Sequence, residues 1–165
     1  MGFKNIIIDT NIIQYYISHP EITSDLRSHL NVPAHAGMKI AISAITKTEL
    51  LETATEQQII EANKILDKIL TFKIYEETLE ASVKIRDLYV EHTKKKLKNI
   101  DIGDCIIAAT SIFTQSLVYT CNRKDFPDPF FTLLDERQLT FSDVKKVKTI
   151  SSYFLAPKFS PGILK

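Results

Sequence analysis

The chain has 165 residues, and its 21 Lys and Arg against 20 Asp and Glu give a formal net charge of +1. Hydrophobic residues make up 44% and charged residues 25%, which is typical of a globular domain and excludes a disordered, fibrous or coiled-coil chain. Because the net charge is so small, any attraction to nucleic acid must come from local clusters of charge.

Two features bear on where the protein works. The longest apolar run near the start, Ile6 to Ile8, ends at Asp9 and is far shorter than a membrane span or the apolar part of a signal peptide. Cys105 and Cys121 lie outside any CxxC pair, and none of the four histidines has the spacing of a zinc site. We therefore expect a cytoplasmic protein with reduced thiols, no zinc and no membrane contact.

Hydrophobic patterning predicts strands that alternate with helices. In chain order it predicts a strand at Asn5–Ile8 that feeds a helix, a short helix from Pro20 to Leu30, a strand at Met38–Ile42 and a helix from Lys47. It then predicts helices around Ile59–Leu70 and Ala81–Leu88 with a strand at Phe72–Tyr75 between them, a helix at Ile102–Phe113, and strands at Leu117–Thr120 and Val144–Ile150. Alternation of this kind predicts an α/β fold, a three-layer α/β/α sandwich with a central parallel sheet. We expect one domain over residues 1–150 and a C-terminal tail at 151–165, which is rich in Pro and Gly.

Four acidic residues come at or after the ends of these strands. Asp9 ends the first strand, Glu49 falls one turn into the helix after the second, Asp104 opens the Ile102 helix, and Asp125 follows the strand at Leu117–Thr120. Because ligands bind at the carboxyl ends of parallel strands, we expect the four carboxylates to share one edge of the sheet. Clustered carboxylates need protons or cations, and Mg²⁺ or Mn²⁺ suits oxygen ligands.

Each acid also has a purely structural interpretation. Asp9 fits the N-cap of the following helix, and Thr46–Glu49 fits a capping box. Asp101 fits an N-cap with Asp104 as an acid of the first helical turn, and Asp125 fits a turn. Only the set of four together indicates a metal site.

Four segments carry a resemblance to a known family. Asp9-Thr10-Asn11, Ile42–Leu50, Asp104–Ala109 and Thr120–Phe126 resemble, in this order, the four acidic motifs of PIN-domain proteins. The closest similarity is to the VapC-like toxins of prokaryotic toxin–antitoxin pairs, which are small ribonucleases. The resemblance runs from about Ile6 to Phe126 and implies a PIN-like nuclease domain and an endoribonuclease that depends on Mg²⁺ or Mn²⁺.

The resemblance also implies roles for particular residues. It makes Asp9 and Asp104 the main metal ligands, with Glu49 helping directly or through water, and Asp125 the acid that completes the catalytic pocket. Asn11 and Thr120 resemble the polar residues that hold the first and last acids in place. Asn122 stands where many relatives have another acid, which lowers the negative charge of the pocket by one.

The chemistry expected of such a site is in-line attack on RNA by a metal-activated water, leaving a 5′ phosphate and a 3′ hydroxyl. Attack by the ribose 2′ hydroxyl is the alternative, and it leaves a cyclic phosphate. The basic residues expected to contact RNA phosphates are Lys94, Lys95, Lys96, Lys98, Arg123 and Lys124. A lysine run is also typical of a solvated helix end, and no aromatic stacking platform is evident among these residues.

Partners follow from the resemblance alone: a small antitoxin that covers the acidic groove, and a second copy in a homodimer. The alternative function is a catalytically weak PIN-like module that binds RNA or protein. A dehalogenase-type phosphatase would need a second acid where Asn11 stands, because general acid catalysis needs an ionisable group. RNA and DNA remain alternative substrates, and the acidic site could hold either one metal ion or two.

Overall fold

The computed structural model describes residues 2–143 and 146–159. Its strands are β1 (Asn5–Ile8), β2 (Lys39–Ser43), β3 (Leu70–Phe72), β4 (Leu117–Thr120), β5 (Phe131–Asp143) and β6 (Lys146–Pro157). Its α-helices are α1 (Thr10–Ser18), α2 (Thr23–His35), α3 (Ala44–Thr53), α4 (Glu56–Leu66), α5 (Glu76–Thr93) and α6 (Ile102–Thr114). Short 3₁₀ helices are η1 (Pro20–Ile22), η2 (Leu97–Asn99) and η3 (Arg123–Asp125). None of the described helices is long and apolar enough to cross a membrane.

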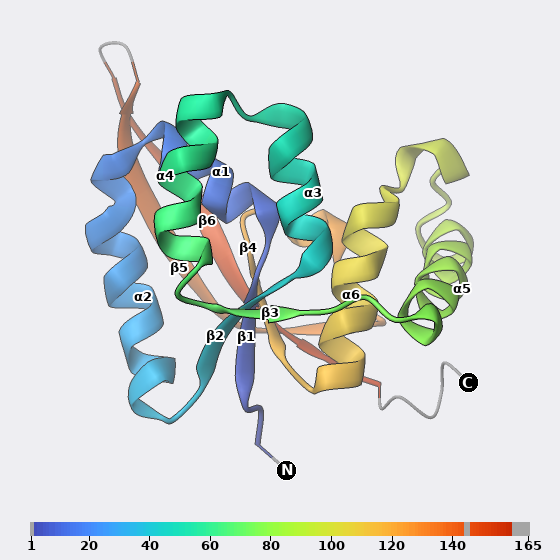
Figure 1. The fold of residues 1–165 in the computed structure, drawn as a ribbon. Helices are drawn as coiled ribbons and strands as arrows, with labels where there is room; N and C mark the ends of the chain where they lie inside the picture. The colour runs from blue at the N-terminus through green and yellow to red at the C-terminus, as the bar shows by residue number, and fades with distance from the viewer. Residues whose placement is uncertain (1, 144–145, 160–165) are drawn as a thin grey trace.

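The six strands form one sheet in the order β3-β2-β1-β4-β6-β5 (Figure 1). β1 pairs in parallel with both β2 and β4, and β2 pairs in parallel with β3. β6 runs antiparallel to β4 on one side and to β5 on the other. The carboxyl ends of β1, β2 and β4 therefore meet at one edge of the sheet.

Helices cover both faces of the sheet, as the alternation of side chains along β1 requires. Ile7 points to the face that packs against α5 and α6. Ile6 and Ile8 point to the other face, which packs against α1, α2 and α4. The predicted three-layer α/β/α sandwich is thus confirmed.

Most predicted elements are present, with shifted ends. The predicted strand at Phe72–Tyr75 lies instead at Leu70–Phe72, where it pairs residue by residue with the end of β2. The second predicted helix extends to His35 and takes Pro33 into its last turn. The helix predicted from Lys47 begins at Ala44, directly after β2.

The sheet differs from the prediction at its C-terminal end. β5 was not predicted, because the polar run from Asp135 to Gln138 interrupts the apolar alternation, and a register shift lies at Leu133/Asp135. β6 begins near the predicted strand but continues to Pro157, so residues 151–157 belong to the sheet and their assignment to a tail was wrong. Residues 160–165 of that predicted tail lie outside the described residues. The sheet is therefore mixed, with only its first four strands parallel throughout.

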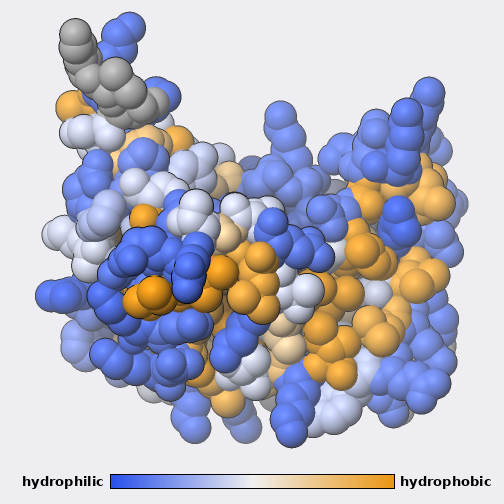
Figure 2. Space-filling view, turned by 45° about the horizontal axis from the view of Figure 1, so that its top comes forward, coloured by the Kyte–Doolittle hydropathy of each residue, from blue (hydrophilic) through white to orange (hydrophobic). Residues whose placement is uncertain are grey.

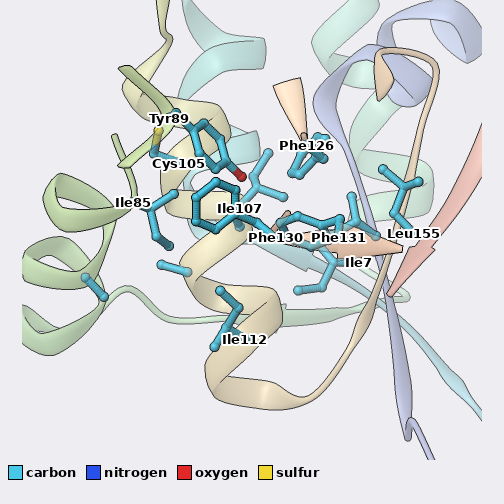
Figure 3. Packing of buried hydrophobic residues seen from close by; sticks show 14 of the residues in the cluster. Ile7, Ile85, Tyr89, Cys105, Ile107, Ile112, Phe126, Phe130, Phe131 and Leu155 are labelled. Carbon is cyan, nitrogen blue, oxygen red and sulfur yellow. The ribbon is translucent and has the colours of Figure 1, made fainter. Parts of the chain in front are cut away.

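Aromatic residues anchor the segment that links β4 to β5 (Figure 3). The ring of Phe130 lies 4.9 Å from that of Tyr89 on α5, and Phe126 meets Phe131 edge to face at 5.3 Å. All four side chains are buried. Their packing holds η3, which carries Asp125, against the end of α5.

Candidate active site

Six carboxylates line one hollow of about 320 Å³ at the carboxyl edge of the sheet. They come from the end of β1, from α3, from the start of α6 and from η3, and they belong to Asp9, Glu49, Glu52, Asp101, Asp104 and Asp125. The structure therefore brings together the four acids that the sequence singled out, and it adds Glu52 and Asp101. Asn11 and Asn122 line the same hollow.

Asp9 is held by three hydrogen bonds, each 2.6 Å long. The backbone N–H of Thr10 donates to Oδ1, while Asn11 Nδ2 and the Thr120 hydroxyl donate to Oδ2. Asp9 is thus the N-cap of α1 and also part of the acidic hollow, so its structural and functional interpretations are compatible. Burial raises the pKa of Asp9 to about 6, even though the bonds from Thr120 and Thr10 act to lower it.

Glu49 does not take part in the capping box suggested by the sequence. α3 starts earlier, after Ser43, and the Thr46 hydroxyl is buried without a partner in the described part of the chain. The Thr10 hydroxyl instead donates a hydrogen bond to the Glu49 carboxylate. Glu49 therefore points toward the end of β1, and burial raises its pKa.

The two acids at the start of α6 differ in their surroundings. Asp101 is the N-cap and accepts a hydrogen bond from the Gly103 N–H at 2.8 Å, as predicted. Burial raises the pKa of Asp104, and the charges of Asp125 and Asp9 raise it further. Burial also raises the pKa of Asp125, to whose carboxylate the Asn122 amide donates a hydrogen bond.

The polar residues match the roles that the resemblance implied in part: Asn11 holds the first acid, Asp9, but Thr120 bonds Asp9 as well rather than the last acid. Asn11 and Thr120 both bond Asp9, and Asn11 Oδ1 also accepts from the Cys121 N–H at 3.0 Å. Asn122, rather than either of them, contacts Asp125. The last acid is therefore held from within its own loop.

No ion pair between residues that the structure describes involves an acid of this cluster. The ion pairs between described residues join Lys64 to Glu61, Arg123 to Asp128 and Arg137 to Asp135. Burial is the main cause of the raised pKa values of the acids in this cluster, and the repulsion between their charges adds to it at Asp9 and Asp104. The carboxylates of the cluster are therefore available to bind protons or cations.

The donor set fits a hard divalent cation in its chemistry, because every candidate ligand atom is a carboxylate or amide oxygen. As placed, however, no three Asp, Glu, His or Cys side chains among the residues described are grouped to hold one ion. Mg²⁺ usually takes only one or two carboxylates and keeps several waters. An ion held by one or two carboxylates and several waters is compatible with the oxygen donor set and with the lack of three grouped side chains among the residues described.

The predicted basic residues divide into two groups. Lys95, Arg123 and Lys124 line a second hollow that adjoins the acidic one. Lys95 lies near enough to Asp125 for its charge to lower the pKa of that acid, although burial prevails. Lys94, Lys96 and Lys98 are exposed and line neither hollow.

Several residues of the acidic hollow were not predicted: Thr10, Gln14, Glu52, Thr53 and Asp101. Helical spacing was a usable signal for three of them. Gln14 lies four residues after Thr10, and Glu52 and Thr53 lie three and four after Glu49, so each shares a helix face with a site residue.

Comparisons with known proteins agree with this geometry. The family model described as PIN domain matches residues 6–129. Among solved structures, the chain is similar to one in the crystal structure of VapBC2 from Rickettsia felis bound to a DNA fragment from their promoter. The TM-score is 0.58 and the identity 20%, over 74% of this chain and 90% of that chain, a likeness that shows the fold. No curated protein sequence matches the chain.

Proposed function

Because the chain belongs to the PIN-domain family, we propose that it is a metal-dependent endoribonuclease and the toxin of a toxin–antitoxin pair. The observation that carries the proposal is the hollow lined by six carboxylates that no cation of the described chain pairs with. Such a cluster is costly to maintain unless cations or protons occupy it.

The side chains of the hollow have separate tasks in this proposal. Asp9 and Asp104 would hold Mg²⁺ or Mn²⁺, with Glu49 beside them and Asp125 completing the pocket. A divalent ion there would polarise the scissile phosphate and lower the pKa of its water. The bonds from Thr10, Asn11 and Thr120 keep Asp9 in one orientation, which a ligand carboxylate needs. Lys95 and Lys124 would attract the RNA backbone toward the acids.

The test is cleavage of a mixed RNA pool by the purified chain in Mn²⁺. We expect Asp9→Asn to reduce the rate by at least about 100-fold, because it removes the charge of an oriented ligand. Asp87→Asn, which changes an exposed acid of α5, serves as the matched control and should cleave at the normal rate. Cleavage at full rate by Asp9→Asn would mean that the nuclease is a contaminant.

The products and the substrate separate the remaining alternatives. Water attack leaves 5′ phosphate and 3′ hydroxyl ends, whereas attack by the 2′ hydroxyl leaves cyclic phosphate ends, and end labelling distinguishes them. A parallel reaction with single-stranded DNA tests the choice of substrate. RNA binding without cleavage by any metal would favour the alternative of a catalytically weak binding module.

A partner protein is part of the proposal. Figure 2 shows hydrophobic residues gathered on the side of the molecule where α5 and α6 lie. The exposed apolar side chains of these helices include Leu79, Val83 and Ile102, which are 47%, 54% and 38% exposed. Apolar patches of this kind mark protein interfaces, for a second copy or for a small antitoxin.

Expression in bacteria should arrest growth, and Asp9→Asn should relieve the arrest.

A further inference from the structure

A second hollow, of about 680 Å³, adjoins the acidic one. It lies between the end of α5, the loop after β4 and strand β6. Asn122 lines both hollows, and Lys95 and Lys124 line this one together with a narrow cavity beside Asp104 and Asp125. The two hollows are therefore neighbours that share lining residues.

The charge of the second hollow is opposite to that of the first. Lys95, Arg123 and Lys124 line it, and its one acid, Asp128, is paired with Arg123 at 2.7 Å. The ion pair fixes the guanidinium at the rim, where 40% of the Arg123 side chain is exposed. The two lysines stand on the side that faces the acidic hollow.

An aromatic ring belongs to the same hollow. Tyr153 of β6 lines it and is half-buried, and the buried Phe126 lines it as well. In the β4–β6 ladder Tyr153 stands directly opposite Thr120, whose hydroxyl bonds Asp9. Since paired strands lie about 4.8 Å apart, Tyr153 is one strand away from the residue that orients Asp9.

We propose that this hollow binds one base of a single-stranded RNA next to the cleaved phosphate, with the base against Tyr153 and the flanking phosphate near Lys95 and Lys124. The inference rests on the proposed function and adds a subsite to it. Unpaired RNA bases stack on aromatic rings, and the volume suits a nucleotide. Because every base has a π-face, the subsite accepts any base and does not read sequence.

The subsite also corrects an expectation from the sequence. No aromatic stacking platform is evident among the basic residues along the chain, but the fold brings Tyr153 from β6 into the hollow that Lys95, Arg123 and Lys124 line. β6 lies beyond residues 6–129, which the family model matches, so Tyr153 is contributed by this chain's own C-terminal hairpin.

The ligand is a nucleotide within a chain rather than a free nucleotide. Both lysines face the acidic hollow, where the next phosphate of a chain would lie. A free mononucleotide carries a single phosphomonoester and no neighbouring phosphate, so it should bind far more weakly than an oligonucleotide.

The experiment measures binding without cleavage. Hexameric oligoribonucleotides with 2-aminopurine at each position in turn are titrated with the protein in EDTA, and anisotropy and base fluorescence are recorded. In the unmodified protein, stacking should quench the 2-aminopurine fluorescence at one position of the hexamer. Tyr153→Leu should abolish the quenching and weaken binding about 5- to 150-fold. Tyr153→Phe should retain both signals.

Controls keep the result interpretable. Tyr75→Leu changes a 62% exposed tyrosine at a different hollow, next to β3, and should leave both signals unchanged. A hexamer that lacks the base at the quenched position should bind the unmodified protein as weakly as the intact hexamer binds Tyr153→Leu. Tyr153→Phe keeps the inference testable if Tyr153→Leu is unstable, because loss of quenching with Phe would contradict stacking.

Two results would overturn the subsite: unchanged affinity and quenching in folded Tyr153→Leu, or adenosine monophosphate binding as tightly as the hexamer. These results are independent of the proposed activity. Tyr153-dependent binding by a protein that never cleaves RNA would refute the nuclease and leave the subsite. Cleavage of RNA together with binding that does not depend on Tyr153 would refute the subsite and leave the nuclease.

Discussion

Gly103 stands in the first turn of α6, where its missing side chain leaves room for the Glu49 carboxylate. A Cβ built on Gly103 would lie 1.9 Å from Glu49 Oε1, far inside van der Waals contact. The obstacle is the far end of a flexible side chain, so it is Glu49 that must move. The glycine thus allows an acid from α3 to reach the start of α6.

Gly103→Ala is therefore expected to separate activity from stability. Alanine favours a helix over glycine by about 1 kcal/mol, so the melting temperature should stay equal or rise slightly. The displaced Glu49 carboxylate should lower the rate of RNA cleavage about 10- to 100-fold, as expected for a disturbed metal site. Gly2→Ala, which meets nothing within 4 Å, is the control. A variant with full activity would show that Glu49 has no role in cleavage.

At the scale of elements, the β5–β6 hairpin extends the sheet beyond the region matched by the family model. Its outer edge is protected, because Asp25 and Glu21 accept hydrogen bonds from the backbone N–H groups of Thr140 and Ser142 at 2.9 and 3.0 Å. Its inner strand places Phe154 on Tyr119 of β4, with ring centroids 4.4 Å apart. The hairpin is therefore part of the core.

Phe154→Ala should destabilise the protein by about 3–5 kcal/mol, because it leaves a cavity beneath β4 where a buried ring has been removed. Urea unfolding followed by circular dichroism measures the change. Val147→Ala, at a 73% exposed position of the same strand, should cost less than about 0.5 kcal/mol. Equal small effects from both variants would mean that β6 is not part of the folded sheet.

At the scale of the whole molecule, a net charge of +1 conceals a strong separation of charge. Acids meet at the carboxyl ends of the strands, and cations line the adjoining hollow. The folded protein keeps the pKa of Asp104 and Asp9 above the ordinary value for Asp, about 3.9. Between the ordinary pKa of Asp and the raised pKa values of these two acids, the folded state therefore binds more protons than the unfolded chain does.

It follows that these two acids make the free energy of unfolding fall as the pH rises from about 4 through their folded pKa values. In EDTA, Asp104→Asn should therefore melt higher than the unmodified protein at pH 8, by about 2 °C or more, with a smaller gap at pH 5. Excess Mn²⁺ should raise the melting temperature of the unmodified protein much more than that of Asp104→Asn. An equal gap at both pH values for Asp104→Asn would contradict this prediction.

Much of the fold was predictable because each strand and helix has a local pattern. β1 and β4 were predicted with their observed ends, and the four acids stand out because each follows a predicted strand or lies near the start of a predicted helix. β5 was missed because polar residues interrupt its pattern. The full length of β6 was missed because a strand covered on both faces lacks alternation, as Phe154 and Leu155 show by being buried one after the other.

The sequence by itself determined the order of the helices and of the first four strands, the family, and which carboxylates can meet, since these depend on patterns within a few residues. Only the tertiary structure decided that Thr10 bonds Glu49, that Gly103 makes room for that carboxylate, and that Tyr153 joins the basic residues. These contacts join residues far apart in the chain, and their geometry depends on how the strands pair and the helices pack, which no local pattern contains.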